Sequence, residues 1–188
     1  NIIVHKDYSI PKQFLKFRPL CLFISYSGNT EETLSGISDA KKNNLDWIVI
    51  SSGGKLIDIA QEEGKEYIKI PSGLQPRAAF GYLTLAISRI LDIVEGSDYV
   101  SQLNEASSYL NKLTEKSKES DINKLSLNIC ESINKKTVII YSGTNMSKVV
   151  SARWKTQINE NAKSKAFVGY LPEVHHNEIL SWDADTDG

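Results

Sequence analysis

Residues 25–33 read Ser-Tyr-Ser-Gly-Asn-Thr-Glu-Glu-Thr and directly follow the apolar run of residues 20–24. The apolar run is typical of a buried strand, and the hydroxyl-rich turn after it opens a helix predicted over residues 30–43. The N-terminus of a helix offers unpaired backbone N–H groups and the positive end of the helix dipole. The pattern therefore predicts a phosphate-binding loop, whose candidate binding residues are Ser25, Ser27, Gly28, Asn29 and Thr30.

The alternative for this loop is an ordinary helix start, in which Ser27 or Asn29 caps the helix and Glu31 and Glu32 complement its dipole. The loop contains no lysine or arginine, which suits the phosphate of a small metabolite better than a polyanionic partner. It also follows a predicted parallel strand, and open α/β sheets bind ligands at the carboxyl ends of their strands. We therefore favour phosphate binding over capping alone.

Arg77 follows Pro76 at a predicted helix start, where the helix dipole disfavours a cation. One interpretation is a solvated or ion-paired arginine. The other is a guanidinium held over an anionic ligand or a developing oxyanion. The residue by itself does not decide between the two.

Two acid–base candidates lie in the second half of the sequence. Glu160 is close to the end of a predicted helix, where a carboxylate is electrostatically disfavoured, and this favours a general base; the alternative is an exposed pair with Lys163. His176 lies in the sequence His-His-Asn-Glu and could act as an acid–base near neutral pH, or simply occupy a surface loop after Pro172. Adjacent histidines diverge in direction, so no metal site is predicted. We expect His5 to be a structural strand end.

The apolar runs and helical patterns alternate along the first half, which predicts an α/β fold with a doubly wound parallel sheet. Expected strands are residues 1–5, 20–25, 46–51 and 66–70, and expected helices are residues 30–43, 55–63 and 76–94. Two polar helices follow, over 101–116 and 121–134. A strand over 137–141, a helix over 146–163 and a strand over 165–170 then repeat the α/β pattern.

The phrase Tyr26-Ser27-Gly28-Asn29 returns as Tyr141-Ser142-Gly143-Thr144-Asn145, each time between a strand and a helix. We therefore predict one nearly complete α/β unit over residues 1–95, a helical connection over 96–136 and the start of a second unit over 137–188. The sequence begins without methionine inside an apolar run and stops after two strands of the second unit. We expect it to be incomplete at one or both ends, and unstable or inactive by itself.

Composition excludes several partners. Among the 188 residues, 22 Lys and Arg balance 23 Asp and Glu, giving a net charge of −1 without blocks of like charge. This argues against nucleic acid or a membrane surface as partner. Cys21 and Cys130 show no pairing pattern, so a reduced, cytoplasmic setting is expected.

The candidate segments, taken together and in this order, resemble the bifunctional phosphoglucose/phosphomannose isomerases, which belong to the sugar isomerase (SIS) domain proteins. The resemblance runs from the first residues to about Trp182, and it is carried by Ser25–Thr33, Pro76-Arg77, Asn159-Glu160-Asn161-Ala162-Lys163 and His176-Asn177-Glu178-Ile179. It implies two SIS domains of the flavodoxin-like type. It also implies a homodimer with active sites near the domain and subunit junction. The family's first strand with its glycine-serine loop, and a later segment with a C-terminal lysine, have no counterpart in this sequence.

The resemblance also implies roles for individual residues. Residues matching Ser25, Ser27 and Thr30 bind the sugar phosphate, and the arginine matching Arg77 stabilises the enediolate. The glutamate matching Glu160 moves the proton between C2 and C1, and the histidine matching His176 assists ring opening across the subunit interface. No metal or other cofactor is implied.

The expected function is isomerisation of glucose 6-phosphate and fructose 6-phosphate, with mannose 6-phosphate as a further candidate substrate. Two alternatives stay open. A non-catalytic regulatory module that binds a phosphosugar would need only the Ser25–Thr33 loop. An aminosugar-phosphate enzyme would share that loop without obviously sharing Glu160 and His176.

Overall fold

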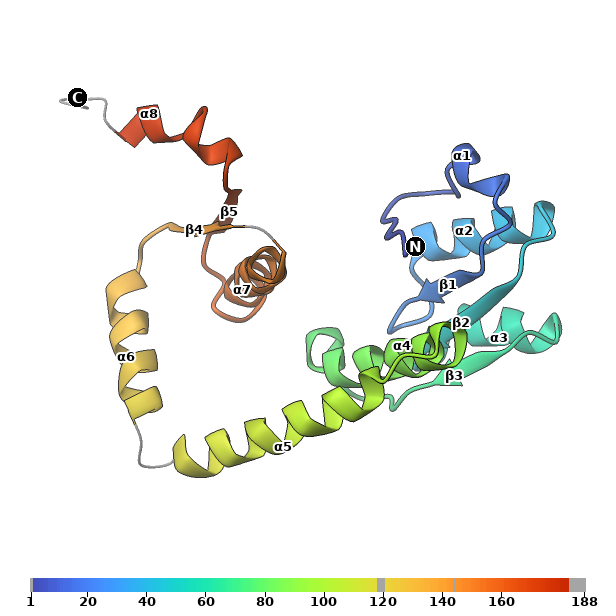
Figure 1. The fold of residues 1–188 in the computed structure, drawn as a ribbon, viewed down its shortest axis with the longest axis horizontal. Helices are drawn as coiled ribbons and strands as arrows, with labels where there is room; N and C mark the ends of the chain where they lie inside the picture. Colours follow the sequence, from blue (N-terminus) through green and yellow to red (C-terminus); the bar gives the residue numbers. More distant parts are fainter. Residues whose placement is uncertain (1, 118–120, 144, 183–188) are drawn as a thin grey trace. The chain divides into compact units, whose positions relative to one another are not determined.

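A computed structural model describes residues 2–117, 121–143 and 145–182 of the chain (Figure 1). The chain divides into two units, Asn1–Tyr109 and Leu110–Gly188, and each is described by itself. The first unit holds α1 (Lys12–Leu15), β1 (Cys21–Ile24), α2 (Glu31–Lys42), β2 (Trp47–Ser51), α3 (Lys55–Glu62), β3 (Tyr67–Lys69), the short 3-10 helix η1 (Pro76–Ala78), α4 (Phe80–Glu95) and the start of α5 (Tyr99–Ser117). The second holds the rest of α5, then α6 (Asp121–Ile133), β4 (Val138–Ser142), α7 (Met146–Asn161), β5 (Ala166–Tyr170), the 3-10 helix η2 (Glu173–His175) and α8 (Ile179–Trp182).

The first unit is built around a three-stranded parallel sheet in the order β1-β2-β3. Successive side chains of a strand point to opposite faces, and both faces are apolar here. On one face Phe23 and Val49 pack with Ile37 of α2 and Leu56 of α3. The other face and the β3–α4 region form a second cluster, made of Ile50, Ile70, Ala79, Ala86 and Ile90. Helices thus cover both faces, which confirms the predicted doubly wound fold.

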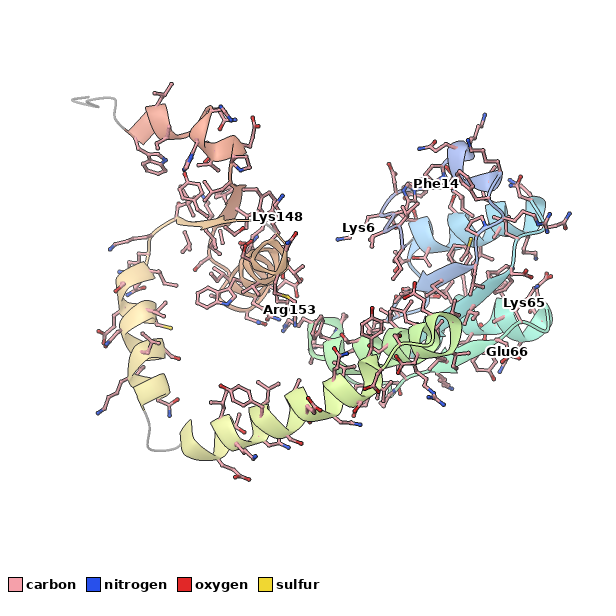
Figure 2. The ribbon with its side chains drawn as sticks, viewed as in Figure 1. Lys6, Phe14, Lys65, Glu66, Lys148 and Arg153 are labelled. Atoms are coloured by element: carbon pink, nitrogen blue, oxygen red, sulfur yellow. The ribbon has the colours of Figure 1, made fainter. Side chains whose placement is uncertain are left out.

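The second unit contains a two-stranded parallel sheet, in which β4 pairs with β5 from Val138 opposite Ala166 to Ser142 opposite Tyr170. Helix α7 is the crossover between these two strands, so it runs antiparallel to both. The ammonium group of Lys148 on α7, labelled in Figure 2, lies 5.3 Å from the centre of the Tyr170 ring. The helix is therefore attached to the sheet by a cation–π contact as well as by its connections.

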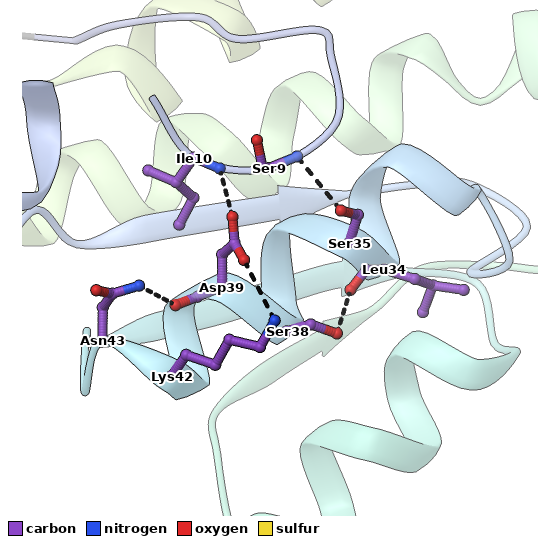
Figure 3. A network of polar contacts seen from close by, with 8 residues as sticks. All are labelled: Ser9, Ile10, Leu34, Ser35, Ser38, Asp39, Lys42 and Asn43. Atoms are coloured by element: carbon purple, nitrogen blue, oxygen red, sulfur yellow. Dashed lines mark hydrogen bonds and ion pairs between the residues drawn. The ribbon is translucent and has the colours of Figure 1, made fainter. Parts of the chain in front are cut away.

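The prediction of a strand over residues 1–5 is wrong. Residues 2–5 form no strand and are exposed, so His5 is not a strand end. The following segment lies along α2 instead: the N–H of Ser9 donates to Ser35 Oγ at 3.3 Å, and the N–H of Ile10 to Asp39 Oδ2 at 3.1 Å (Figure 3). A strand needs backbone partners, and here side chains of a helix accept these backbone donors.

The helix predicted from Pro76 begins later. Residues 76–78 form the 3-10 turn η1, and α4 starts at Phe80. Arg77 therefore lies before α4 rather than in its first turn. The apolar side chains of α4 are only partly buried: Phe80 is 55% exposed, whereas Leu83 and Ile87 pack against the core.

The apolar side chains along α7 are largely exposed: four of them are about half or more exposed, namely Met146, Val149, Val150 and Trp154. Within the described ranges, none of the helices combines the length and apolar character that crossing a membrane requires.

Helix α5 begins on a cap supplied by α4. The carboxylate of Asp92 accepts hydrogen bonds from Tyr99 N at 2.7 Å, Val100 N at 3.0 Å and Ser97 Oγ at 2.9 Å. Partial burial acts to raise the pKa of Asp92, but the hydrogen bonds from Val100, Tyr99 and Ser97 outweigh it and lower that pKa below its ordinary value. The ionised form is thus the one that the folded state favours.

Replacing Asp92 with asparagine is expected to destabilise the fold at pH 7, because an amide offers one acceptor atom where the carboxylate offers two. A carboxylate with a lowered pKa stabilises the fold above its unfolded pKa, and this stabilisation is lost as the pH falls through the folded pKa. The difference in unfolding free energy between wild type and Asp92→Asn should therefore be largest at pH 7 and shrink at acid pH. Urea titrations at both pH values measure it. Glu95→Gln on the same helix is the control, and an equal pH response of both variants would contradict this role.

Candidate active site

The predicted phosphate loop leaves β1 at Ser25 and enters α2 at Glu31. Ser25 is 6% exposed, and its Oγ lies 2.6 Å from Thr30 Oγ1 and accepts the N–H of Gly28 at 3.2 Å. Ser25 therefore braces the loop from inside, which holds the curve of the turn. Ser27 and Thr30 are exposed, so their side chains are the ones that a ligand reaches most directly.

The expectation that Ser27 or Asn29 caps α2 is wrong. The N-cap residue is Thr30, and its side chain makes no capping hydrogen bond to the helix. Asn29 instead links two loops: its Nδ2 donates to Ser27 O at 3.2 Å, and its Oδ1 accepts the N–H of Lys55 at the start of α3 at 3.1 Å. The N-terminus of α2 is thus left without a side-chain cap from Thr30, as an anion site requires.

A second turn, at residues 51–54 (Ser-Ser-Gly-Gly), supports the loop and was not singled out from the sequence. The carbonyl oxygen of Tyr26 accepts hydrogen bonds from Ser52 N at 3.0 Å, Ser52 Oγ at 2.6 Å and Ser51 Oγ at 3.3 Å. The sequence pattern that predicts the first loop also occurs here, since hydroxyl residues and glycines again follow a buried strand and precede a helix. The two turns lie at the carboxyl ends of the adjacent parallel strands β1 and β2.

Acidic side chains surround the start of α2. The Tyr8 hydroxyl donates to Glu31 Oε2 at 3.3 Å, and the carboxylates of Glu32 and Glu31 raise the pKa of Tyr8. Carboxylates in the first turn favour the helix dipole. The same carboxylates would repel a phosphate at this position. A ligand held by the loop would therefore need further contacts elsewhere.

Arg77 belongs to the same unit as the loop and follows β3, the third strand of the sheet. Because β1 and β3 run parallel, the segment after each strand lies at the same carboxyl edge. The Arg77 side chain is half-buried and has interactions of its own. The topology thus places the predicted phosphate site and the predicted enediolate-stabilising residue at one edge.

Glu160 and His176 both lie in the second unit, but at opposite ends of its sheet. Glu160 is exposed near the end of α7, where Asn159 Oδ1 accepts the N–H of Ala166 at the first residue of β5, at 2.9 Å. His176 is exposed after η2, which follows the last residue of β5. Helix α7 has 16 residues and spans about 24 Å between the two sheet edges.

A metal site in the part of the chain that the structure describes would need His, Cys, Asp or Glu side chains that lie close together. Within residues 2–117, 121–143 and 145–182, no group of three or more His, Cys, Asp or Glu side chains is arranged to hold a metal ion. A shallow cavity of about 360 Å³ lies at the amino end of β5, lined by residues that include Lys155, Asn159, Lys163 and Lys165. Glu160 is not among its lining residues.

Comparison with known proteins shows what the chain is similar to. The model of the bacterial phospho-glucose isomerase C-terminal SIS domain matches residues 122–188. The bifunctional phosphoglucose/phosphomannose isomerase of Caldicellulosiruptor bescii is 38% identical over 97% of this chain, and that of Aquifex aeolicus is 39% identical over 95%. The chain is therefore similar to these isomerases over most of its own length. It spans about half the length of these curated relatives, 55% and 52% respectively.

A relative whose name describes another activity has a similar sequence identity to this chain. The D-glucosamine-6-phosphate 4-epimerase of Sulfolobus acidocaldarius is 37% identical over 83% of this chain, which covers 48% of that protein. Among solved structures, a hypothetical protein from Thermus thermophilus matches with a TM-score of 0.61 at 16% identity, covering 91% of this chain and 47% of that one. A structure from Bacillus subtilis matches with a TM-score of 0.59 at 19% identity, covering 89% of this chain and 54% of that one. At these identities the structures support the fold alone.

Gly28 is the residue at which the loop is most sensitive. Its φ is +71°, and a Cβ at this position would overlap the carbonyl oxygen of Gly53. Gly28→Ala is expected to separate the two turns and to lower stability by at least about 1 kcal/mol, because it adds backbone strain to a clash with main-chain atoms. Thermal and urea unfolding measure the loss.

Gly143 is the matched control, since it occupies the same place in the repeated Tyr-Ser-Gly phrase. Among the described residues, a Cβ at Gly143 would meet only Ser147 Oγ, at 3.6 Å, and the φ of Gly143 is not in the left-handed region. Gly143→Ala should therefore unfold like the wild type. Equal losses in both variants would contradict the account of the Gly28–Gly53 contact.

Proposed function

We propose that the complete polypeptide carrying this chain isomerises glucose 6-phosphate and fructose 6-phosphate, with mannose 6-phosphate as a further substrate. The observation that carries the proposal is the Ser25–Thr30 loop. The exposed residues Ser27 and Thr30 lie at the start of α2, and the side chain of the N-cap residue Thr30 makes no capping hydrogen bond to the helix. Buried Ser25 bonds to Thr30 Oγ1, and Ser52 of the second turn bonds to the carbonyl oxygen of Tyr26. The names of the curated relatives support a sugar-phosphate isomerase. The two free cysteines agree with a reduced, cytoplasmic setting.

The proposed mechanism needs four groups. The loop anchors the 6-phosphate, and His176 moves a proton at the ring oxygen so that the sugar opens. Glu160 then removes the proton at C2 and returns it at C1 while the hydroxyl proton at O2 passes to O1, and ring closure completes isomerisation. The Arg77 guanidinium stabilises the negative oxygen of the enediolate between these steps. No step requires a cofactor.

The positions of Glu160 and His176 support a dimeric site. The two residues lie at opposite edges of one two-stranded sheet. Within one subunit, this sheet therefore does not place both side chains beside the same sugar. In a symmetric dimer each site can take Glu160 from one subunit and His176 from the other. We also propose that residues 1–95 and 137–188 belong to two SIS domains joined by the helical connection 96–136.

Glu160→Gln in the complete polypeptide is expected to lower kcat by about 10²–10⁴-fold, because the amide keeps the shape of the side chain but cannot take the C2 proton. KM for glucose 6-phosphate should change little, since the phosphate loop is untouched. A coupled assay and exchange of the C2 proton with solvent measure the two steps. Glu62→Gln, at an exposed position on α3, is the control. Undiminished turnover of Glu160→Gln would remove this residue from the role of base.

Mixing two inactive variants tests the dimeric site. Glu160→Gln and His176→Ala subunits, unfolded together and refolded, should recover roughly a quarter of wild-type activity, because half of the dimers are mixed and each has one intact site of two. Each variant refolded alone should stay at its own low level. A mixture that is no more active than its components would show that Glu160 and His176 act within one subunit or not together.

The aminosugar-phosphate alternative has a specific observation in its favour, the 37% identical epimerase. The same assays with glucosamine 6-phosphate discriminate between the two. Turnover of the amino sugar but not of glucose 6-phosphate would favour the epimerase. Binding of phosphosugars without turnover of any would favour the regulatory module.

A further inference from the structure

We propose that Tyr26 is a positioning residue, which holds the segment that carries Arg77 in place for the proposed isomerisation. The proposal rests on the proposed function, and it assigns a task to a residue of the phosphate loop that has no ligand role. The proposal follows from the hydrogen bonds of the Tyr26 hydroxyl and from the packing of the Tyr26 ring.

The Tyr26 hydroxyl is attached to the loop that leads into Arg77. It accepts the N–H of Leu74 at 2.8 Å and donates to the carbonyl oxygen of Pro71 at 3.3 Å. Residues 71–75 form no helix or strand, so they lack the regular hydrogen bonds that would define their path. One phenol therefore satisfies both a donor and an acceptor of this loop, three residues before Arg77.

The ring of Tyr26 holds the other side of the same segment. It packs against the cluster that contains Ala79, which is fully buried and lies two residues after Arg77. Arg77 is thus flanked by residues 71–74, which bond to the Tyr26 hydroxyl, and by Ala79, which belongs to the cluster that Tyr26 packs against. The main chain of Tyr26 is meanwhile fixed by Ser51 and Ser52, as described above. The residue connects the phosphate loop to the arginine segment directly.

The repeated phrase shows the same arrangement a second time. Tyr141, the counterpart of Tyr26, donates its hydroxyl to Glu178 Oε2 at 3.0 Å and accepts Trp182 Nε1–H at 2.9 Å. Its ring lies against Gly169, where a Cβ would overlap it. In each unit the tyrosine of the Tyr-Ser-Gly phrase holds the segment that carries a predicted catalytic residue, Arg77 in the first and His176 in the second.

Tyr26→Phe in the complete polypeptide tests the proposal, because it removes only the hydroxyl. We expect kcat for glucose 6-phosphate to fall about tenfold and KM to change by less than about twofold, since a displaced catalytic group costs rate while the phosphate contacts remain. Hydrogen exchange at Leu74 should become faster, and exchange at residues 47–51 should not. Tyr67→Phe is the matched control: that hydroxyl accepts Gln61 Nε2–H at 3.0 Å at the start of β3, at the other end of the sheet.

A double-mutant cycle separates positioning of Arg77 from a general structural effect. If Tyr26 acts through Arg77, Tyr26→Phe should cost nothing further in an Arg77→Ala background. A tenfold loss that persists there, or a rise in KM with kcat unchanged, would overturn the positioning role. An active wild type with an unaffected Tyr26→Phe variant would overturn only this inference. A wild type that turns over no sugar phosphate would overturn the proposed function itself.

Discussion

The contact between two turns at the carboxyl edge of the first sheet is the constraint on which the rest of the site depends. The carbonyl oxygen of Tyr26 accepts three hydrogen bonds from Ser51 and Ser52, and Gly28 lies against the main chain of Gly53. Main chain meets main chain here, so no side chain can yield to make room. These main-chain contacts therefore fix the shape of the predicted phosphate loop.

The polar side chains of the loop bond to one another and to the start of α3. Ser25 Oγ lies 2.6 Å from Thr30 Oγ1, Ser27 Oγ accepts the N–H of Asn29, and Asn29 Oδ1 accepts the N–H of Lys55. Ser27, Asn29 and Thr30 are nevertheless exposed beside the N-terminus of α2. Tyr26 links this loop to a second one. The hydroxyl of Tyr26 organises a neighbouring loop while its backbone organises the phosphate loop.

Much of the fold could be predicted because buried parallel strands appear in the sequence as short, nearly continuous apolar runs. The runs at 20–25 and 46–51 are apolar on both faces, whereas the run at 66–70 is exposed at Tyr67 and Lys69. Each of the three runs forms a strand within a residue or two of its predicted ends. The run at residues 1–5 is similarly apolar, but residues 2–5 form no strand. An apolar run does not by itself specify a neighbouring strand with which to pair. Substrate-binding and catalytic roles stay predictions for all the site residues, Ser25 to Thr30, Arg77, Glu160 and His176 alike.

The sequence by itself determined the parallel α/β layers and the loop at which a phosphate is expected, because these depend on local patterns of apolar, hydroxyl and glycine residues. Only the tertiary structure decided that Asn29 bonds to the start of α3 rather than capping α2, that Arg77 precedes α4, and that Glu160 and His176 lie at opposite edges of one sheet. Each of these depends on which segments distant in sequence meet in space. Spacing along a chain does not contain that information, since loop closure and pairing are settled by the packing of the whole unit.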